Sequence, residues 1–198
     1  MFKYIYIPCI ALLFACTEQP TEEVAVVENT PPEVMDVHSY ANPEMAVVKH
    51  LDLDIIVNFD SKIISGVANW KILNNNSDSI FFDIDGIEIE KVTINNRVET
   101  SYTIGEKDPI LGSKLSVLIQ PQTEVVSIFY KTTPGSRALQ WLNEEQTHGK
   151  KHPFLFTQSQ AILARTWLPC QDSPGIRYTY NAKVKVPPEL MALMSANN

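Results

Sequence analysis

Residues 47–72 read VVKHLDLDIIVNFDSKIISGVANWKI and contain two runs in which apolar side chains recur at every second position. In the first run, Leu51, Leu53 and Ile55 alternate with aspartates. This two-residue period predicts a half-buried β-strand, and the second run predicts another. Residues 58–62, NFDSK, lie between the two runs. They predict the turn that joins the two strands.

Short segments of the same kind continue outward from this pair, separated by turn signals. They are residues 80–84, 87–94, 98–104, 115–119, 124–130 and 178–186. A change of phase near Lys91 predicts a β-bulge, and Asn95-Asn96 predicts a tight turn. Because the 3.6-residue period of helices is almost absent, the sequence predicts an all-β fold. We expect an antiparallel β-sandwich with covered edges.

The composition sets the size of the core and excludes one class of partner. Of the 198 residues, 44% are hydrophobic, which is enough to bury one sizeable core. The chain carries 16 basic and 23 acidic residues, a formal net charge of −7. Nucleic-acid binding requires clustered Lys and Arg, so we expect no nucleic-acid partner.

Residues 1–15 predict a lipoprotein signal peptide and not a part of the fold. Lys3 gives a short positive region, and residues 5–14 are almost entirely apolar. Residues 13–16, LFAC, resemble the cleavage box of bacterial lipoproteins, in which the cysteine after the cut takes a diacylglycerol. We therefore expect Cys16 to be lipidated and to anchor the protein to a membrane of the cell envelope, facing the periplasm or the cell surface. The alternatives are an ordinary signal peptide or a short anchor, but the apolar run is too short to span a bilayer.

Residues 16–36 predict the lipidated cysteine followed by an acidic, flexible tether. After Cys16 this segment contains six acidic residues, three prolines and no basic residue. Such a composition keeps a chain extended and without a core. Its expected role is to hold the domain away from the lipid surface, and the alternative is a leader with no spacing role. Cleavage removes Cys9 and lipid consumes Cys16, so Cys170 remains as a thiol and no intramolecular disulfide is expected.

Three motifs follow one another closely within residues 136–196. They are HPFLF at 152–156, QSQA at 158–161 and LPCQD at 168–172. This stretch resembles the end of the N-terminal domain of the M1 zinc aminopeptidases, and within that family the leukotriene-A4-hydrolase branch. The resemblance implies a saddle-like β-structure that lies against a catalytic domain. It assigns residues 37–198 to this N-terminal β-domain.

The QSQA step is the candidate substrate-binding site. In the M1 family the second glutamine of this step binds the free N-terminus of the peptide substrate, and here that residue is Gln160. The resemblance also implies that Ala161 lines the pocket for the first side chain and that Gln158 supports the site. A primary amide suits this role because it offers donors and an acceptor while it stays neutral. Without the flanking motifs, the same glutamines would be surface amides on a strand.

Other conspicuous residues of this stretch have structural interpretations. Cys170 has no histidine base near it in sequence, so we expect a small buried core residue and not a nucleophile. His148 and His152 have zinc-helix spacing, but a glycine and a proline follow them, so we expect a loop. Arg165 could pair with Asp172 or with another domain, and we favour the internal pair. The aromatic side chains expected in the core are Trp141, Phe154, Phe156 and Trp167.

The family's catalytic motifs, HExxH with a downstream Glu and the GxMEN loop, do not occur in residues 1–198. The resemblance therefore predicts a fragment of a lipid-anchored zinc aminopeptidase that is inactive by itself. Zinc is expected in the full-length parent and not on this chain. The expected partners are peptide substrates, the missing C-terminal catalytic domain and the membrane. The alternative is a lipid-anchored β-sandwich module that binds a partner without catalysis.

Overall fold

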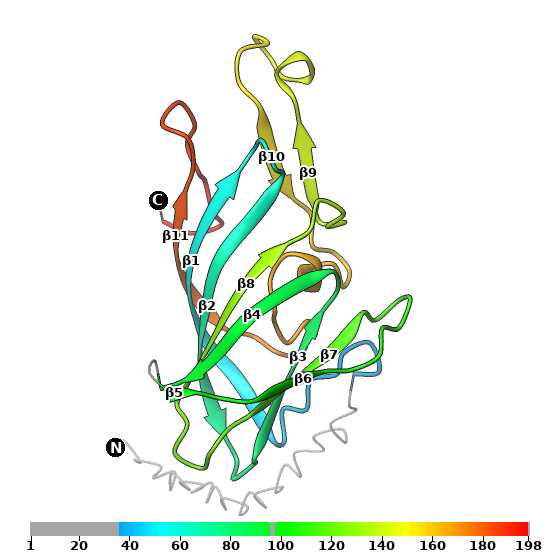
Figure 1. The fold of residues 1–198 in the computed structure, drawn as a ribbon, viewed down its shortest axis with the longest axis vertical. Coiled ribbons are helices and arrows are strands. Elements are labelled where there is room, and N and C mark those ends of the chain that lie inside the picture. The colour runs from blue at the N-terminus through cyan, green and yellow to red at the C-terminus, as the bar shows by residue number, and fades with distance from the viewer. Residues whose placement is uncertain (1–35, 96–97, 198) are drawn as a thin grey trace, which may run out of the picture. The chain divides into compact units, whose positions relative to one another are not determined.

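The computed structural model describes residues 36–95 and 98–197, and this part of the chain contains eleven strands and two short 3-10 helices. Six strands form one large sheet in the order β11-β1-β2-β8-β4-β5 (Figure 1). They are β1 (Ala46–Asn58), β2 (Ile63–Asn74), β4 (Ile87–Ile94), β5 (Val98–Glu99), β8 (Val125–Thr132) and β11 (Thr179–Lys185). Two smaller sheets have the orders β3-β7-β6 and β10-β9. Their strands are β3 (Ser79–Ile84), β6 (Tyr102–Ile104), β7 (Ser113–Leu118), β9 (Leu139–Leu142) and β10 (Phe154–Thr157).

Within the described residues, helix is confined to η1 (Glu144–Gln146) and η2 (Ala164–Thr166). The predicted all-β fold class is therefore confirmed. No helix in this part of the chain is long and apolar enough to cross a bilayer. The predicted signal peptide, Cys16 and nearly all of the predicted tether lie outside the described residues.

The first two strands form the antiparallel hairpin that their alternating pattern predicts. Leu51 lies opposite Trp70, and Leu53 lies opposite Ala68. The predicted phase change in β4 is also confirmed, because the pairing of β4 with β8 shifts between Ile89 and Lys91. These pairings place the apolar residues of β1, β2, β4 and β8 on the same buried face.

One strand pair departs from the antiparallel expectation. β11 pairs in parallel with β1, so that Leu51 lies opposite Tyr180 and Leu53 lies opposite Ala182. A parallel pair requires a long crossover between its strands. Here all the other strands lie between β1 and β11 in the chain, and the last part of the connection runs through the β9–β10 hairpin and η2 before the chain returns to the edge of the large sheet (Figure 1). The two-residue period of residues 178–186 is the same for both strand directions and cannot distinguish them.

The core lies where the inner face of the large sheet meets the three-stranded sheet. Trp70 of β2 is fully buried, and its ring centroid lies 6.3 Å from that of Phe82 on β3. The indole Nε1 of Trp70 donates a hydrogen bond to the carbonyl oxygen of Pro169 at 3.0 Å. Burial of an aromatic side chain of this size contributes roughly 3 kcal/mol. Trp70 therefore joins the large sheet both to β3 and to the loop that contains the LPCQD motif.

Candidate substrate-binding site

The QSQA step emerges directly from the end of a β-hairpin. In this hairpin Leu155 of β10 lies opposite Trp141 of β9. The N–H of Gln158 donates to the carbonyl oxygen of Ala138 at 2.9 Å, which extends the pairing one residue beyond β10. The N–H of Leu163 then donates to the Ser159 carbonyl at 2.9 Å and closes the turn that leads into η2. The step is thus fixed at both ends by backbone hydrogen bonds.

The three predicted site residues are all exposed. They are Gln158, Gln160 and Ala161. The side-chain Oε1 of Gln158 accepts a hydrogen bond from the backbone N–H of Gln160 at 3.1 Å, and the Gln160–Ala161 peptide bond is cis. Within the described part of the chain, no hydrogen bond is found for the carboxamide of Gln160. Its donors and its acceptor can therefore bind a ligand, while its backbone is held by Gln158.

Ser159, between the two glutamines, fastens the step to the body of the domain. Its hydroxyl oxygen accepts a hydrogen bond from the indole Nε1 of Trp167 at 3.2 Å. Trp167 packs against the hydrophobic core and follows directly after η2. The alternation of the step therefore directs Ser159 inward and leaves Gln158 and Gln160 outward.

Arg165 is buried and fixes the chain that follows the QSQA step. The Arg165 side chain is fully buried, and its Nε lies 3.0 Å from Oδ2 of Asp172. Its two terminal nitrogens donate to the carbonyl oxygens of Leu111 at 2.7 Å and His38 at 2.8 Å. The predicted Arg165–Asp172 pair is confirmed. Burial raises the pKa of the Asp172 carboxyl above its ordinary value, although Arg165 opposes this effect.

Asp83 lies at the end of β3 nearest this arginine, and its carboxylate accepts three hydrogen bonds. Its oxygens accept from the Ser39 hydroxyl, from the Tyr40 N–H at 2.7 Å and from the Asp172 N–H at 2.8 Å. The guanidinium of Arg165 lies 3.8 Å from Asp83. Hydrogen bonds to a charged carboxylate are stronger than those between two neutral groups. They tie the segment before β1 to the loop that follows η2.

The LPCQD motif has a structural role that the sequence did not reveal. The buried side chain of Gln171 accepts from the N–H of Val48 at 3.0 Å and donates to the Ala46 carbonyl at 3.0 Å. It also donates to the Phe81 carbonyl at 3.2 Å. Gln171 therefore pairs with backbone groups of β1 and β3. Without this side chain, these buried groups would have no hydrogen-bond partner, which costs free energy. The sequence signal that could have revealed this role is the LPCQD motif itself, because its glutamine had been given no function.

The structure places Cys170 in the core and the two histidines in a loop, as the sequence predicts. Cys170 is buried, and this burial raises the pKa of its thiol, which opposes a nucleophilic role. His148 and His152 are exposed in the loop between η1 and β10, as expected. Among the described residues there is no group of three or more His, Cys, Asp or Glu able to hold a metal ion.

Two aromatic side chains predicted to be in the core are not buried there. Phe154 is 52% exposed and Phe156 is 45% exposed, whereas Trp141 and Trp167 pack against the core. The prediction was wrong because β10 belongs to a two-stranded hairpin that has one inner face. Leu155 occupies that face, and alternation places both phenylalanines on the other.

Comparison with known proteins identifies the family. The model of the peptidase M1 N-terminal domain matches residues 47–198. Leukotriene A-4 hydrolase of Xenopus laevis is 39% identical over 168 residues, which cover 81% of this chain and 27% of the relative. Leucine aminopeptidase 2-2 of Scheffersomyces stipitis is 36% identical, with coverages of 83% and 26%. The chain belongs to the M1 peptidase family and contains its N-terminal domain.

Solved structures agree with this assignment. Yeast leukotriene A4 hydrolase in complex with bestatin matches with a TM-score of 0.73 and 30% identity. The match covers 80% of this chain and 26% of that one. An M1 zinc metallopeptidase from Deinococcus radiodurans bound to a Tyr-Ser-Ala substrate has a TM-score of 0.56 at 18% identity, so it shares the fold. The chain spans about a quarter of the length of the curated relatives that it matches.

Proposed function

We propose that this chain is the N-terminal domain of a lipid-anchored zinc aminopeptidase and that Gln160 binds the α-amino group of the peptide substrate. The observation that carries the proposal is the exposed carboxamide of Gln160, whose backbone N–H is held by Gln158. Gln160 also occupies the second glutamine position of the QSQA step. A neutral amide oxygen accepts hydrogen bonds from an ammonium group without titrating itself.

Gln158 and Ala161, which belong to the same QSQA step as Gln160, have supporting roles in this proposal. Gln158 positions the backbone of Gln160 through its Oε1, and exposed Ala161 lines the space for the first side chain of the peptide. The described residues do not offer a set of zinc ligands. We therefore assign zinc and bond cleavage to a catalytic domain of the parent polypeptide, where zinc would supply an activated water. This chain contributes recognition and is inactive by itself.

The lipid anchor is the second part of the proposal. It rests on the apolar run before the LFAC box and on the acidic, proline-containing tether that follows Cys16. Acyl chains on Cys16 would hold the enzyme at a membrane of the cell envelope, since each buried CH₂ contributes about 0.8 kcal/mol. Peptides in that compartment are then the substrate class.

The test uses the parent polypeptide with the substitution Gln160→Ala. A hydrogen bond to a charged group contributes about 1.5–3 kcal/mol, so we expect kcat/KM for an aminoacyl-arylamide to fall by about tenfold or more. The matched control is Gln122→Ala, because Gln122 is exposed in the turn before β8. Unchanged Michaelis parameters in Gln160→Ala would contradict the proposal.

A further inference from the structure

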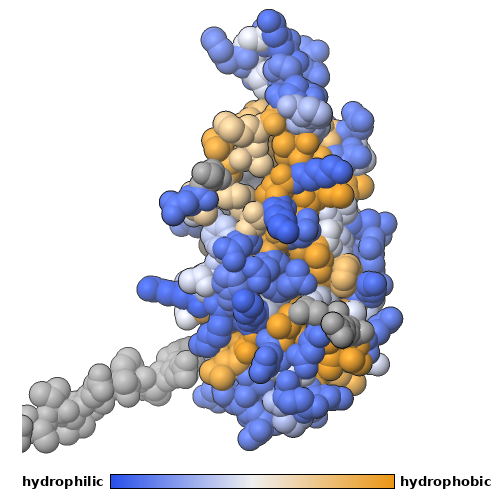
Figure 2. Space-filling view, turned by 90° about the vertical axis from the view of Figure 1, so that its left-hand side faces the viewer, coloured by the Kyte–Doolittle hydropathy of each residue, from blue (hydrophilic) through white to orange (hydrophobic). Residues whose placement is uncertain are grey.

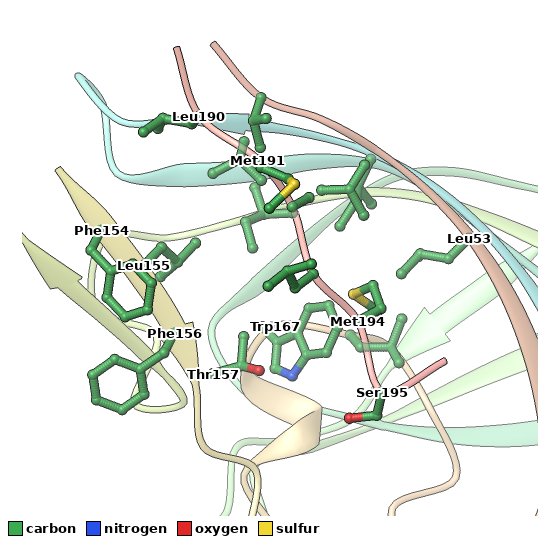
Figure 3. Close-up of a pocket in the computed structure, with 18 of the residues that line it drawn as sticks. Leu53, Phe154, Leu155, Phe156, Thr157, Trp167, Leu190, Met191, Met194 and Ser195 are labelled. Carbon is green, nitrogen blue, oxygen red and sulfur yellow. The ribbon is translucent and has the colours of Figure 1, made fainter. Parts of the chain in front are cut away.

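Four polar side chains form a two-by-two group on the face of the large sheet that points away from the core. In the parallel pairing of β1 with β11, His50 lies opposite Thr179 and Asp52 lies opposite Asn181. Because successive side chains of a strand alternate between its two faces, His50 and Asp52 share one face of β1. Leu53 lies on the other face, in the core, and lines an apolar cleft there (Figure 3). The group therefore places imidazole, carboxylate, hydroxyl and amide groups side by side at the edge of the sheet.

Three atoms of this group form a nearly equilateral triangle. The Nε2 atom of His50 lies 3.2 Å from Oδ1 of Asp52. The carboxamide nitrogen of Asn181 lies 3.2 Å from the imidazole Nε2 and 3.0 Å from the carboxylate oxygen. Three ligand atoms on one face of an octahedral metal ion, each about 2.1 Å from it, lie about 3 Å from each other. The triangle therefore has the size of a facial metal-binding set.

The carboxamide of Asn181 can present either of its two ends to this triangle. Its nitrogen donates to Asp52 and faces Nε2 of His50, so it holds two acceptor atoms close together. A half-turn of the carboxamide places its oxygen where the nitrogen lies, because the two ends have nearly the same shape. An imidazole nitrogen, a carboxylate oxygen and an amide oxygen then converge on one point. All three are metal ligands in proteins.

The neighbours of the triangle favour the binding state of each ligand. The Nδ1 atom of His50 lies 2.7 Å from the Thr179 hydroxyl oxygen, and donation to that oxygen leaves a lone pair on Nε2. Metal-binding histidines almost always have such a partner on the other ring nitrogen. The hydrogen bond from Asn181 lowers the pKa of the Asp52 carboxyl, which is therefore ionised at neutral pH. Lys71 lies 3.7 Å from Oδ2 of Asp52; its charge opposes a cation, but its side chain is 60% exposed and can turn into solvent.

We propose that His50, Asp52 and Asn181 bind a divalent first-row transition-metal ion in octahedral geometry, with water in the other three positions. The side chains of His50 and Asp52 are 20% and 44% exposed, so water can reach the ion. Imidazole together with oxygen ligands suits ions such as Fe²⁺ and Ni²⁺. The described residues contain no metal-binding group of three or more His, Cys, Asp or Glu, and here an amide completes the set. Two ligands of those types are too few for a zinc site, which takes three or four.

The ion would join the edge strand β11 to its neighbour. Among the described strands, β11 lies at the end of the large sheet and pairs with β1 alone. Figure 2 shows the side of the molecule on which β11 lies in Figure 1, where hydrophilic side chains cover much of the surface below an apolar upper region. An ion that binds the folded chain and not the unfolded chain stabilises the fold. This metal site is independent of the proposed function, because none of its residues belongs to the QSQA step.

Calorimetric titration with Ni²⁺ tests the proposal. The protein is the 198-residue chain with Cys9→Ser and Cys16→Ser, which removes two thiols that could bind the ion. We expect one Ni²⁺ per chain. Losing a group that only supports a metal ligand costs about tenfold or more in affinity, so His50→Gln should weaken binding by at least about tenfold. The matched control combines His148→Gln with His152→Gln, which are exposed in a loop, and should leave the affinity unchanged.

Variants of Asn181 distinguish a metal ligand from a structural hydrogen bond. Asn181→Ala should weaken Ni²⁺ binding by at least about tenfold. Asn181→Asp should bind Ni²⁺ more tightly than the original chain, because a second carboxylate adds ligand charge. If Asn181 had a structural role alone, the aspartate variant would gain no affinity, since it places two carboxylates together and loses the donor to Asp52.

Nuclear magnetic resonance locates the bound ion. Paramagnetic Ni²⁺ should broaden the backbone amide signals of residues 50, 52, 179 and 181 before all others. Absence of Ni²⁺ binding, or equal affinities of the original chain and His50→Gln, would overturn the proposal. Broadening centred on residues 148–152, with loss of binding in the control variant, would assign the ion to the loop and would overturn it as well.

Discussion

The Oε1 atom of Gln158 accepts a hydrogen bond from the backbone N–H of Gln160 at 3.1 Å. The first glutamine of the QSQA step thus fixes the backbone from which the second one projects. Because Ser159 is held by Trp167 and Gln158 by Ala138, the whole step is anchored to the core. Such support from neighbouring residues keeps a binding side chain in its productive geometry.

This relationship predicts how Gln158 variants behave in the parent polypeptide. Gln158→Met removes the acceptor at nearly constant volume, and a neutral hydrogen bond contributes about 0.5–1.5 kcal/mol. We expect kcat/KM to fall by about three- to tenfold, with most of the change in KM. Gln158→Glu keeps an oxygen acceptor and should restore KM to near the original value. Equal losses in both variants would show that the hydrogen bond does not position Gln160.

The buried Arg165 predicts a large effect on stability. Arg165→Met would leave Asp172 and Asp83 without their cation in a buried site, and breaking such a pair costs about 3–5 kcal/mol. Arg137→Met removes an exposed partner of Asp85 and should cost about 1 kcal/mol or less. Urea unfolding of the 198-residue chain measures both free energies. A loss below about 1 kcal/mol for Arg165→Met would contradict the role of this arginine as a clamp.

Asp85 predicts a specific pH dependence. Burial opposes ionisation of its carboxyl, but Lys107 and Arg137 outweigh it and hold the pKa of Asp85 below the ordinary value of 3.8. Because the pKa is lowered in the folded state, this stabilisation is present above the unfolded-state pKa and is lost as pH falls below it. Between pH 5 and about pH 3, the original protein should lose more unfolding free energy than Asp85→Asn. Parallel curves for the two proteins would contradict this assignment.

The proposed anchor predicts the location of the protein. Cells that carry the chain with Cys16→Ser should release it into the aqueous phase of a detergent partition, whereas the unchanged chain should enter the detergent phase. Two or more acyl chains give lasting membrane attachment. The two proteins should therefore separate almost completely between the detergent phase and the aqueous phase. Metabolic labelling with an alkyne fatty acid supplies a direct readout of the modified cysteine. Labelling that persists in Cys16→Ser would place the lipid elsewhere or remove the proposal.

Side-chain period predicted the strands well because each face of a half-buried strand repeats every two residues. The β1–β2 pair with its turn and the phase change near Lys91 could be predicted in this way, whereas the register that places Leu51 opposite Trp70 could not. The direction of β11 was not readable, because a parallel and an antiparallel strand have the same period. The exposure of Phe156 was not readable either, because sequence does not tell how many sheets cover a hairpin.

The candidate site was located through resemblance and not through local chemistry. Gln160 and Gln158 have no sequence property that separates them from ordinary surface amides, and the motifs on either side provided the signal. Other contacts near the site escaped prediction because they join residues far apart in the chain. Gln171, for example, bonds to Val48, which is 123 positions away. Such long-range hydrogen bonds depend on the packed fold and have no local period.

The most direct test of the central claim compares two inhibitors of the parent polypeptide that differ in one group, a free α-amino group or a hydrogen in its place. If Gln160 binds the amine, Gln160→Ala should weaken the amino inhibitor by about tenfold or more and leave the other unchanged. Equal effects of Gln160→Ala on the two inhibition constants, or none on either, would contradict the account.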